Sequence, residues 1–148
     1  MKAQIVYASM TGNDEDMAEI LADDLEETGW EVESADVSFA DAAAYQDADL
    51  CVFVSYTYGE GVMTDEVADF YAQLTGLDLT GKPFFVMGSG DKSYGEHYCE
   101  TAEDMRKGFE KTGAYEILKP IEIENEVDDP EMKLIDEVAV QLTAKLNA

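Results

Sequence analysis

Near-continuous apolar segments of strand length alternate along the chain with longer segments of helical periodicity. The clearest apolar segment is DLCVFVSY (49–56), which is apolar at most of its positions. Strands of this kind are buried on both faces, and the helices between successive strands supply the two covering layers. The pattern therefore predicts a parallel sheet between two layers of helices.

Five strands are predicted in this way. Besides 49–56 they are AQIVYAS (3–9), WEVESADV (30–37), KPFFVMGSG (82–90) and YEILKPIEI (115–123). Apolar residues recur three or four positions apart, as on one face of a helix, at 17–25, 67–74, 98–109 and 135–146, and a short helical turn is expected at 40–46. Pro120 predicts an edge or a bulge in the last strand, because proline donates no hydrogen bond to the ladder.

The order of these elements predicts an α/β fold of three layers, in which a doubly wound parallel sheet has the strand order 2-1-3-4-5. The 148 residues contain no internal repeat and no linker, so one domain spanning 1–148 is expected. Ligands of such sheets bind at the carboxyl ends of the strands, beside the switch point between the first and third strands. The loops 9–14, 55–65 and 88–98 are therefore the candidate site.

The charge of the chain limits its partners. Thirty-four acidic residues against nine lysines and arginines give a net charge of −25. Nucleic acid and anionic membrane surfaces are poor partners for such a molecule, whereas a basic docking surface on another protein is a good one. An interpretation of equal weight is that the acids only keep the protein soluble or reflect a salty habitat.

Location and chemistry follow from what the chain lacks. No segment approaches the roughly 18 apolar residues of a membrane span, and MKAQIVYAS does not resemble a secretory signal, so a cytoplasmic protein is expected. Cys51 and Cys99 form no CxxC pattern and are expected to be reduced, semi-buried thiols. A lone histidine in a loop is usually solvated, so His97 receives no catalytic role, and neither a catalytic nor a metal site is predicted.

The first candidate loop, SMTGND, has the features of a phosphate site. Ser9 and Thr11 offer hydroxyl groups, and Gly12 permits close approach of the backbone. The free amides at the start of the following helix stabilise an anion without any lysine. A plain turn with Asn13 or Asp14 as the helix N-cap explains the same residues equally well.

The second loop, SYTYGEG, places two tyrosines after a buried strand. A flat aromatic ligand explains aromatic side chains at this position, because the rings stack on it. The alternative is that Tyr56 or Tyr58 folds back over the end of the sheet.

The third loop, GSGDKSYGEHYC, begins with small residues. Their exposed amides and carbonyls suit the edge of a heteroaromatic ring, and Tyr94 offers a second aromatic plane.

With these three motifs in this order, at the ends of the first, third and fourth strands, the chain resembles the short-chain bacterial flavodoxins over essentially its whole length. SMTGND corresponds to the phosphate loop S/T-x-T-G-x-T of that family, and the chain lacks the long insertion of the long-chain group. The resemblance implies a flavodoxin-like fold and non-covalently bound FMN. It also implies a low-potential one-electron carrier between redox proteins that is not itself an enzyme. A monomer is expected, because such a shuttle must expose its cofactor edge to several partners.

The resemblance also implies which residues bind the cofactor. Around the phosphate they are Ser9, Met10, Thr11, Gly12, Asn13 and Asp14, with Thr57 close by. Around the ring they are Tyr58 and Tyr94 on its two faces, Ser89, Gly90 and Asp91 at its pyrimidine edge, and Cys99 nearby. Gly59 and Glu60 form the peptide that flips when the flavin takes up a proton at N5, a movement that glycine tolerates best.

Stacked tyrosines and a field of carboxylates disfavour the electron-rich, anionic reduced flavin, so the second reduction step is expected at low potential. A hydrogen bond from N5–H to the carbonyl of Gly59 favours the neutral one-electron state. The cofactor supplies the chemistry and the protein supplies binding and electrostatics.

Asp14 departs from the family pattern, which has threonine at this position. A carboxylate about 4 Å from a phosphate charge costs roughly 4 kcal/mol per pair of unit charges at an effective dielectric constant of 20. Asp14 either turns away and caps the helix, where negative charge is favourable, or weakens the phosphate site. The hypothesis is that FMN binds less tightly than it would to a threonine variant.

The residues also argue against several other functions. GLDLTGKP (76–83) nearly matches a Walker A motif but precedes a strand, and no GxGxxG follows the first strand. A response-regulator receiver requires acidic residues at the ends of the first and third strands, where this chain has YAS and SYTYG. Two alternatives stay open: a flavoprotein dedicated to one enzyme, such as a ribonucleotide reductase activator, and a non-redox binding module that has lost tight FMN binding.

Overall fold

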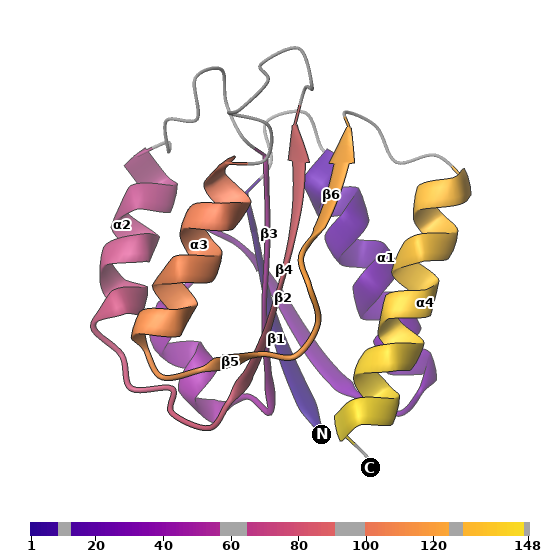
Figure 1. Ribbon diagram of the computed structural model, residues 1–148, viewed down its shortest axis with the longest axis horizontal. Helices are drawn as coiled ribbons and strands as arrows, with labels where there is room; N and C mark the ends of the chain where they lie inside the picture. Colours follow the sequence, from indigo (N-terminus) through magenta and orange to yellow (C-terminus); the bar gives the residue numbers. More distant parts are fainter. Residues whose placement is uncertain (9–12, 57–64, 91–99, 125–128, 147–148) are drawn as a thin grey trace.

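The computed structural model describes residues 1–8, 13–56, 65–90, 100–124 and 129–146 (Figure 1). In chain order the elements are β1 (Lys2–Ala8), α1 (Asn13–Glu27), β2 (Glu31–Asp36), the 3₁₀-helix η1 (Ala42–Asp47), β3 (Leu50–Tyr56), α2 (Asp65–Thr75), β4 (Pro83–Gly90), α3 (Glu100–Lys111), β5 (Tyr115–Glu116), β6 (Ile121–Glu124) and α4 (Asp129–Leu146). None of the described helices is both long enough and apolar enough to cross a membrane.

All strands pair in parallel, in the order β2-β1-β3-β4-β5, which confirms the predicted order. The register places Ile5 of β1 opposite Val52 of β3, and Val52 opposite Phe85 of β4. Figure 1 shows α1 and α4 on one side of this sheet and α2 and α3 on the other. The three layers predicted from the sequence are therefore present.

The last predicted strand, 115–123, is interrupted. β5 pairs with the start of β4 at Pro83 and Phe84, whereas β6 pairs with the end of β4. Between them the chain leaves the ladder (Figure 1). Pro120 lies in this interruption, and its lack of an amide hydrogen explains why the ladder does not continue through it.

The strand β3 fills two cores with alternate side chains. Leu50, Val52 and Val54 belong to the core under α1 and α4, and Cys51 and Phe53 belong to the core under α2, α3 and η1. All five are completely buried. This arrangement explains why the segment is apolar without alternation.

The second core is rich in aromatic rings. Phe53 stacks on Phe70 with ring centres 5.5 Å apart, and Tyr45 meets Phe109 edge-on at 5.3 Å. The buried hydroxyl of Tyr45 donates a hydrogen bond of 2.7 Å to the carbonyl oxygen of Val52, which offsets the cost of its burial. Burial raises the pKa of Tyr45 well above its ordinary value.

The helices α1 and α4 contact each other through a pair of carboxyl groups. Asp24 of α1 lies against Asp136 of α4, and one oxygen of Asp24 is buried without a hydrogen-bond partner among the described residues. Burial, followed by the hydrogen bond to Asp136 and the repulsion of its charge, raises the pKa of Asp24 to about 7. The pair therefore holds a proton at pH values at which carboxyl groups are normally ionised.

This pair predicts a pH-dependent stability. Because the pKa of Asp24 is raised from 3.8 to about 7, its protonated form stabilises the fold fully below pH 3.8, and the contribution is lost as the pH rises through about 7. We expect Asp24→Asn to raise the free energy of unfolding at pH 8 and to flatten its decrease between pH 5 and pH 8. Urea denaturation at several pH values measures this. The control is Glu19→Gln, which removes one exposed charge from the same helix; an equal effect of both variants would contradict the role of the pair.

Gly113, which follows α3, has a backbone conformation that favours glycine. Its φ is +87°, and a Cβ added there would lie 2.5 Å from Oγ1 and 3.1 Å from Cα of Thr80. Gly81 has a similar φ of +83°, but a Cβ added there meets nothing within 4 Å.

Alanine substitutions at the two glycines therefore measure the cost of backbone strain and the cost of steric overlap separately. We expect Gly81→Ala to lower the free energy of unfolding by about 1 kcal/mol, the cost of the left-handed conformation. Gly113→Ala is expected to cost about 2 kcal/mol more, because Thr80 must also move. Urea denaturation followed by circular dichroism compares the two, and equal losses would show that the chain around Thr80 accommodates the methyl group freely.

Candidate functional site

The carboxyl ends of three neighbouring strands meet at one edge of the sheet. Ala8 of β1 is paired with Ser55 of β3, Ser55 with Gly88 of β4, and Tyr56 with Ser89. Figure 1 shows that α1, α2 and α3 begin at this same edge. A ligand at this edge therefore meets strand ends and helix N-termini together, which is the usual binding position of doubly wound sheets.

The first turn of α1 is suited to an anion. The helix begins at Asn13, only five positions after β1 ends at Ala8. Amide groups in the first turn of a helix have no partner within the helix, and the helix dipole places partial positive charge beside them. Asn13 and Asp14, the last two residues of the predicted phosphate loop, are the first two residues of α1.

A buried hydroxyl group at the edge lacks a partner. Ser55 is completely buried, and its Oγ has no hydrogen-bond partner among the described residues. It alternates with Cys51 and Phe53, so it faces the side of the sheet covered by α2 and α3. An unsatisfied buried hydroxyl costs about 1–3 kcal/mol, a cost that a polar ligand at this edge can offset.

Ser55 was not among the residues predicted to bind the cofactor. The sequence points to it only as a hydroxyl that follows the apolar residues LCVFV of the strand. That signal does not tell whether the hydroxyl has a partner, because the answer depends on neighbouring strands.

The structure describes four of the predicted cofactor-binding residues. Asn13 and Asp14 start α1, and Ser89 and Gly90 end β4, where Ser89 is completely buried. All four are thus at the same edge of the sheet. The remaining predicted residues lie outside the described residues: Ser9, Met10, Thr11, Gly12, Thr57, Tyr58, Gly59, Glu60, Asp91, Tyr94 and Cys99.

Negative charge surrounds the β1 side of the edge. Tyr7, one residue before the end of β1, has a pKa raised first by burial and then by the charges of Glu15, Asp36 and Glu19. Two of these carboxylates come from α1 and one from β2, so they approach the strand end from separate elements. A negative charge that develops at this edge is opposed by their field.

The β4 side of the edge also carries carboxyl groups. Glu122 of β6 pairs with Gly88, and burial followed by the charge and hydrogen bond of Glu103 raises its pKa. Glu103 also lies 3.6 Å from the guanidinium of Arg106, which binds both carboxylate oxygens of Glu116 farther from this edge, beside the start of β4. Two carboxyl groups, Glu103 and Glu122, thus lie together on the β4 side of the edge.

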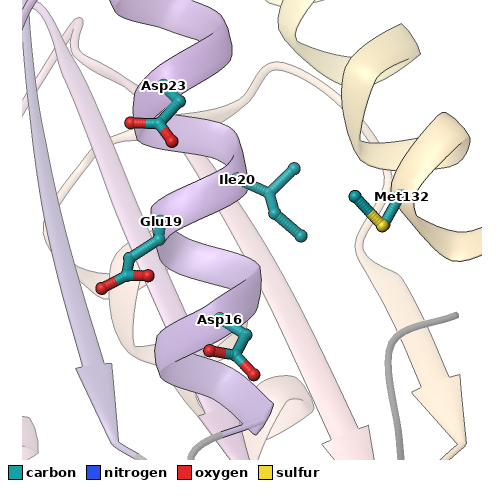
Figure 2. A pocket seen from close by; sticks show the side chains of 5 residues that line it. All are labelled: Asp16, Glu19, Ile20, Asp23 and Met132. Atoms are coloured by element: carbon teal, nitrogen blue, oxygen red, sulfur yellow. The ribbon is translucent and has the colours of Figure 1, made fainter.

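A pocket beside α1 is unsuited to a phosphate. It has a volume of about 270 Å³ and is lined by Asp16, Glu19, Ile20 and Asp23 of α1 and by Met132 of α4. Figure 2 shows the side chain of Ile20 directed toward Met132, with the three carboxylates along α1. Three like charges repel an anion, so this side of the helix does not suit a phosphate.

The described residues offer little for metal or thiol chemistry. Within the described segments, no group of three or more His, Cys, Asp or Glu side chains is arranged to hold a metal ion. Cys51 is a free, buried thiol, and burial raises its pKa to about 12. This thiol stays protonated at neutral pH and is a poor nucleophile.

Comparison with known proteins gives the same picture. Residues 5–139 match the model of the flavodoxin family. A probable flavodoxin 2 of Bacillus subtilis is 32% identical over 131 residues, which are 88% of this chain and 86% of the relative. The solved structure of a short-chain flavodoxin associated with a bacterial microcompartment is 37% identical, with a TM-score of 0.94 and 99% of both chains covered. The NADPH–cytochrome P450 reductase of Homo sapiens is 38% identical over 122 residues, which are 78% of this chain and 18% of the reductase.

The sheet order, the helix that starts close behind β1 and these matches agree with one another. The length and the structural match are those of the short-chain type. The chain therefore belongs to the flavodoxin family: it binds FMN non-covalently and carries electrons, and it is not an enzyme.

Proposed function

We propose that this chain carries single electrons at low potential between redox proteins that dock through basic surfaces. We also propose that it works as one domain, as a monomer and in the cytoplasm. The observation that carries the low potential is the field of Glu15, Glu19 and Asp36 at the strand end that leads into the phosphate loop.

The direction of the effect follows from charge. Reduction adds electrons at this edge, and each carboxylate nearby opposes the added negative charge. For a carboxylate about 10 Å away, Coulomb's law at an effective dielectric constant of 20 gives roughly 1.7 kcal/mol before salt screening. Several such groups lower the potential of a flavin below the value that it has in water. Their field, and the stacking of tyrosines on the ring, act in the same direction.

We further propose the cofactor-binding residues named from the sequence. Residues 9–14 and Thr57 hold the phosphate, and Tyr58 and Tyr94 cover the faces of the ring. Ser89, Gly90, Asp91 and Cys99 surround the pyrimidine edge, and the Gly59–Glu60 peptide responds to the proton at N5. The start of α1, the end of β4 and the unpartnered hydroxyl of Ser55 support this arrangement, because all three are at one edge of the sheet.

The proposal of protein partners rests on charge and on similarity. A net charge of −25 favours basic docking surfaces and makes association sensitive to salt. The match to 18% of a much longer reductase supports a protein unit that exchanges electrons with other protein parts. The flavodoxin matches give no support to a module that has lost its flavin.

Titration of the FMN-free protein with FMN and with riboflavin tests the site. We expect flavin fluorescence to be quenched at one equivalent, because tyrosines stack on the ring, and FMN to bind more tightly, because α1 stabilises its phosphate. Equal affinities would show that the ring site works and the phosphate site does not. Absence of quenching by either flavin would contradict the proposed site as a whole.

Asp14 in the first turn of α1 predicts a weakened phosphate site. We expect Asp14→Thr to lower the dissociation constant of FMN by roughly tenfold, equivalent to about 1.4 kcal/mol, and to leave that of riboflavin unchanged. The control is Asp16→Thr, which removes the same charge one position beyond Glu15 on the same helix. An unchanged FMN dissociation constant in Asp14→Thr would show that Asp14 points away from the phosphate and only caps the helix.

A further inference from the structure

Charge is distributed unevenly along the chain. The first 81 residues contain 19 acidic side chains and a single basic one, Lys2, whereas the remaining 67 contain 15 acidic and eight basic side chains. The first group of residues builds β1, α1, β2, η1, β3 and α2. The half of the sheet that ends at β2 is therefore the more negative half of the molecule.

One aromatic side chain stands out on this half. Phe39, in the turn between β2 and η1, is 89% exposed, more than any other large apolar side chain that the structure describes. Single exposed apolar residues are common on protein surfaces and need no explanation by themselves. The surroundings of Phe39 make it unusual.

The turn that carries Phe39 is fixed to the core on both sides. Val37 before it and Ala42 after it are buried. The amide of Phe39 donates to the carbonyl oxygen of Asp36 at 2.9 Å, and the Asp36 carboxylate accepts from the amide of Ser38 at 2.8 Å. The backbone at Phe39 is thus held on an ordered turn, so that little backbone entropy is lost when a partner covers the exposed side chain.

A groove suited to a cationic side chain lies beside this turn. It separates the turn from α2 and has a volume of about 200 Å³. Val37, Ala40 and Phe70 form an apolar lining, and Glu66 and Asp69 add exposed carboxylates. A lysine or arginine fits such a groove, because its aliphatic stem packs on the apolar lining while its charged end reaches the carboxylates.

The turn lies at the edge of the sheet that carries the cofactor site. Asp36 pairs with Tyr7 near the end of β1, and the amide of Val37 donates to the carbonyl oxygen of Tyr7 at 2.8 Å. Only β1 separates β2 from β3, so the ends of β2 and β3 are roughly 10 Å apart. A docking area of about 800 Å² per partner has a radius of about 16 Å and covers both.

We propose that Phe39 and the groove beside it are the docking surface for the redox partner. The surface consists of Phe39, the apolar lining of the groove, and the carboxylates Asp36, Asp41, Glu66 and Asp69. Its partner is a protein with an apolar socket surrounded by lysines and arginines: the socket receives Phe39, and one cationic side chain enters the groove. This inference rests on the proposed function as an electron carrier.

The two parts of the surface have separable effects. Carboxylates attract a basic partner over a distance and mainly raise the rate of association, in a manner that salt screens. A buried aromatic anchor mainly slows dissociation. Loss of Phe39 is therefore expected to weaken the complex at every salt concentration, and loss of Glu66 and Asp69 is expected to slow its formation at low salt.

The experiment uses the FMN-loaded protein and cytochrome c, a basic redox protein, as the probe. The dissociation constant of the two oxidised proteins is measured by calorimetry, and electron transfer from the photoreduced protein is measured by stopped flow over a range of salt concentrations. We expect Phe39→Ala to raise the dissociation constant about fivefold or more, and Phe39→Trp to restore it. Glu66→Gln with Asp69→Asn is expected to lower the second-order rate and to flatten its salt dependence.

Matched controls come from the opposite sides of the molecule. Val140→Ala removes another exposed apolar side chain, on α4, which is 63% exposed. Glu26→Gln with Glu27→Gln also removes two negative charges, but at the C-terminal end of α1. If Phe39→Ala changes the dissociation constant no more than Val140→Ala does, this surface is not the docking site. The same conclusion follows if the two pairs of charge variants have the same second-order rate and salt dependence.

The FMN dissociation constant of each variant separates this inference from the proposed function. Wild-type protein that binds no FMN, or that binds it and transfers no electron, contradicts the function. Suppose that the wild-type protein binds FMN and transfers electrons, and that the Phe39 and Glu66/Asp69 variants bind FMN normally but transfer electrons at the same rates as the controls. That result contradicts only the docking surface.

Discussion

The hydrogen-bonded ladder of β1, β3 and β4 is the constraint on which the rest of the structure depends. Because β3 is central in this ladder, its side chains must satisfy two cores at once, and Val52 and Phe53 lie on opposite faces. The parallel direction also brings three strand ends and three helix starts to one edge. The edge at which doubly wound sheets bind their ligands is thus formed by the ladder and not by any single loop.

Much of this was predictable, because burial on both faces leaves a plain mark in a sequence. The strand order and the three layers were predicted, and so was the weakness at Pro120, although the full interruption between β5 and β6 was not. Contacts between side chains of distant segments have no comparable pattern in the sequence and were not predicted. The proton shared by Asp24 and Asp136 and the unpartnered hydroxyl of Ser55 depend on which strands and helices become neighbours. A single sequence identifies these residues, but it does not show which residues from distant segments lie next to them.

The acids of this chain act on stability and on electron transfer with the same physics. Around Tyr7 they oppose negative charge at the carboxyl ends of the strands. Between α1 and α4, the burial of Asp24, its hydrogen bond to Asp136 and the charge of that group together keep a proton on Asp24. Arg106, between Glu103 and Glu116, is one of the few places where a cation relieves this repulsion.

The uneven charge of the chain also governs how copies of the protein meet one another. Two copies that approach through the β2 side bring their more negative halves together, and Phe39 of one copy finds carboxylates and not a basic socket on the other. Like charges on these halves oppose close contact between two copies through the β2 side, and added salt weakens that repulsion by screening it.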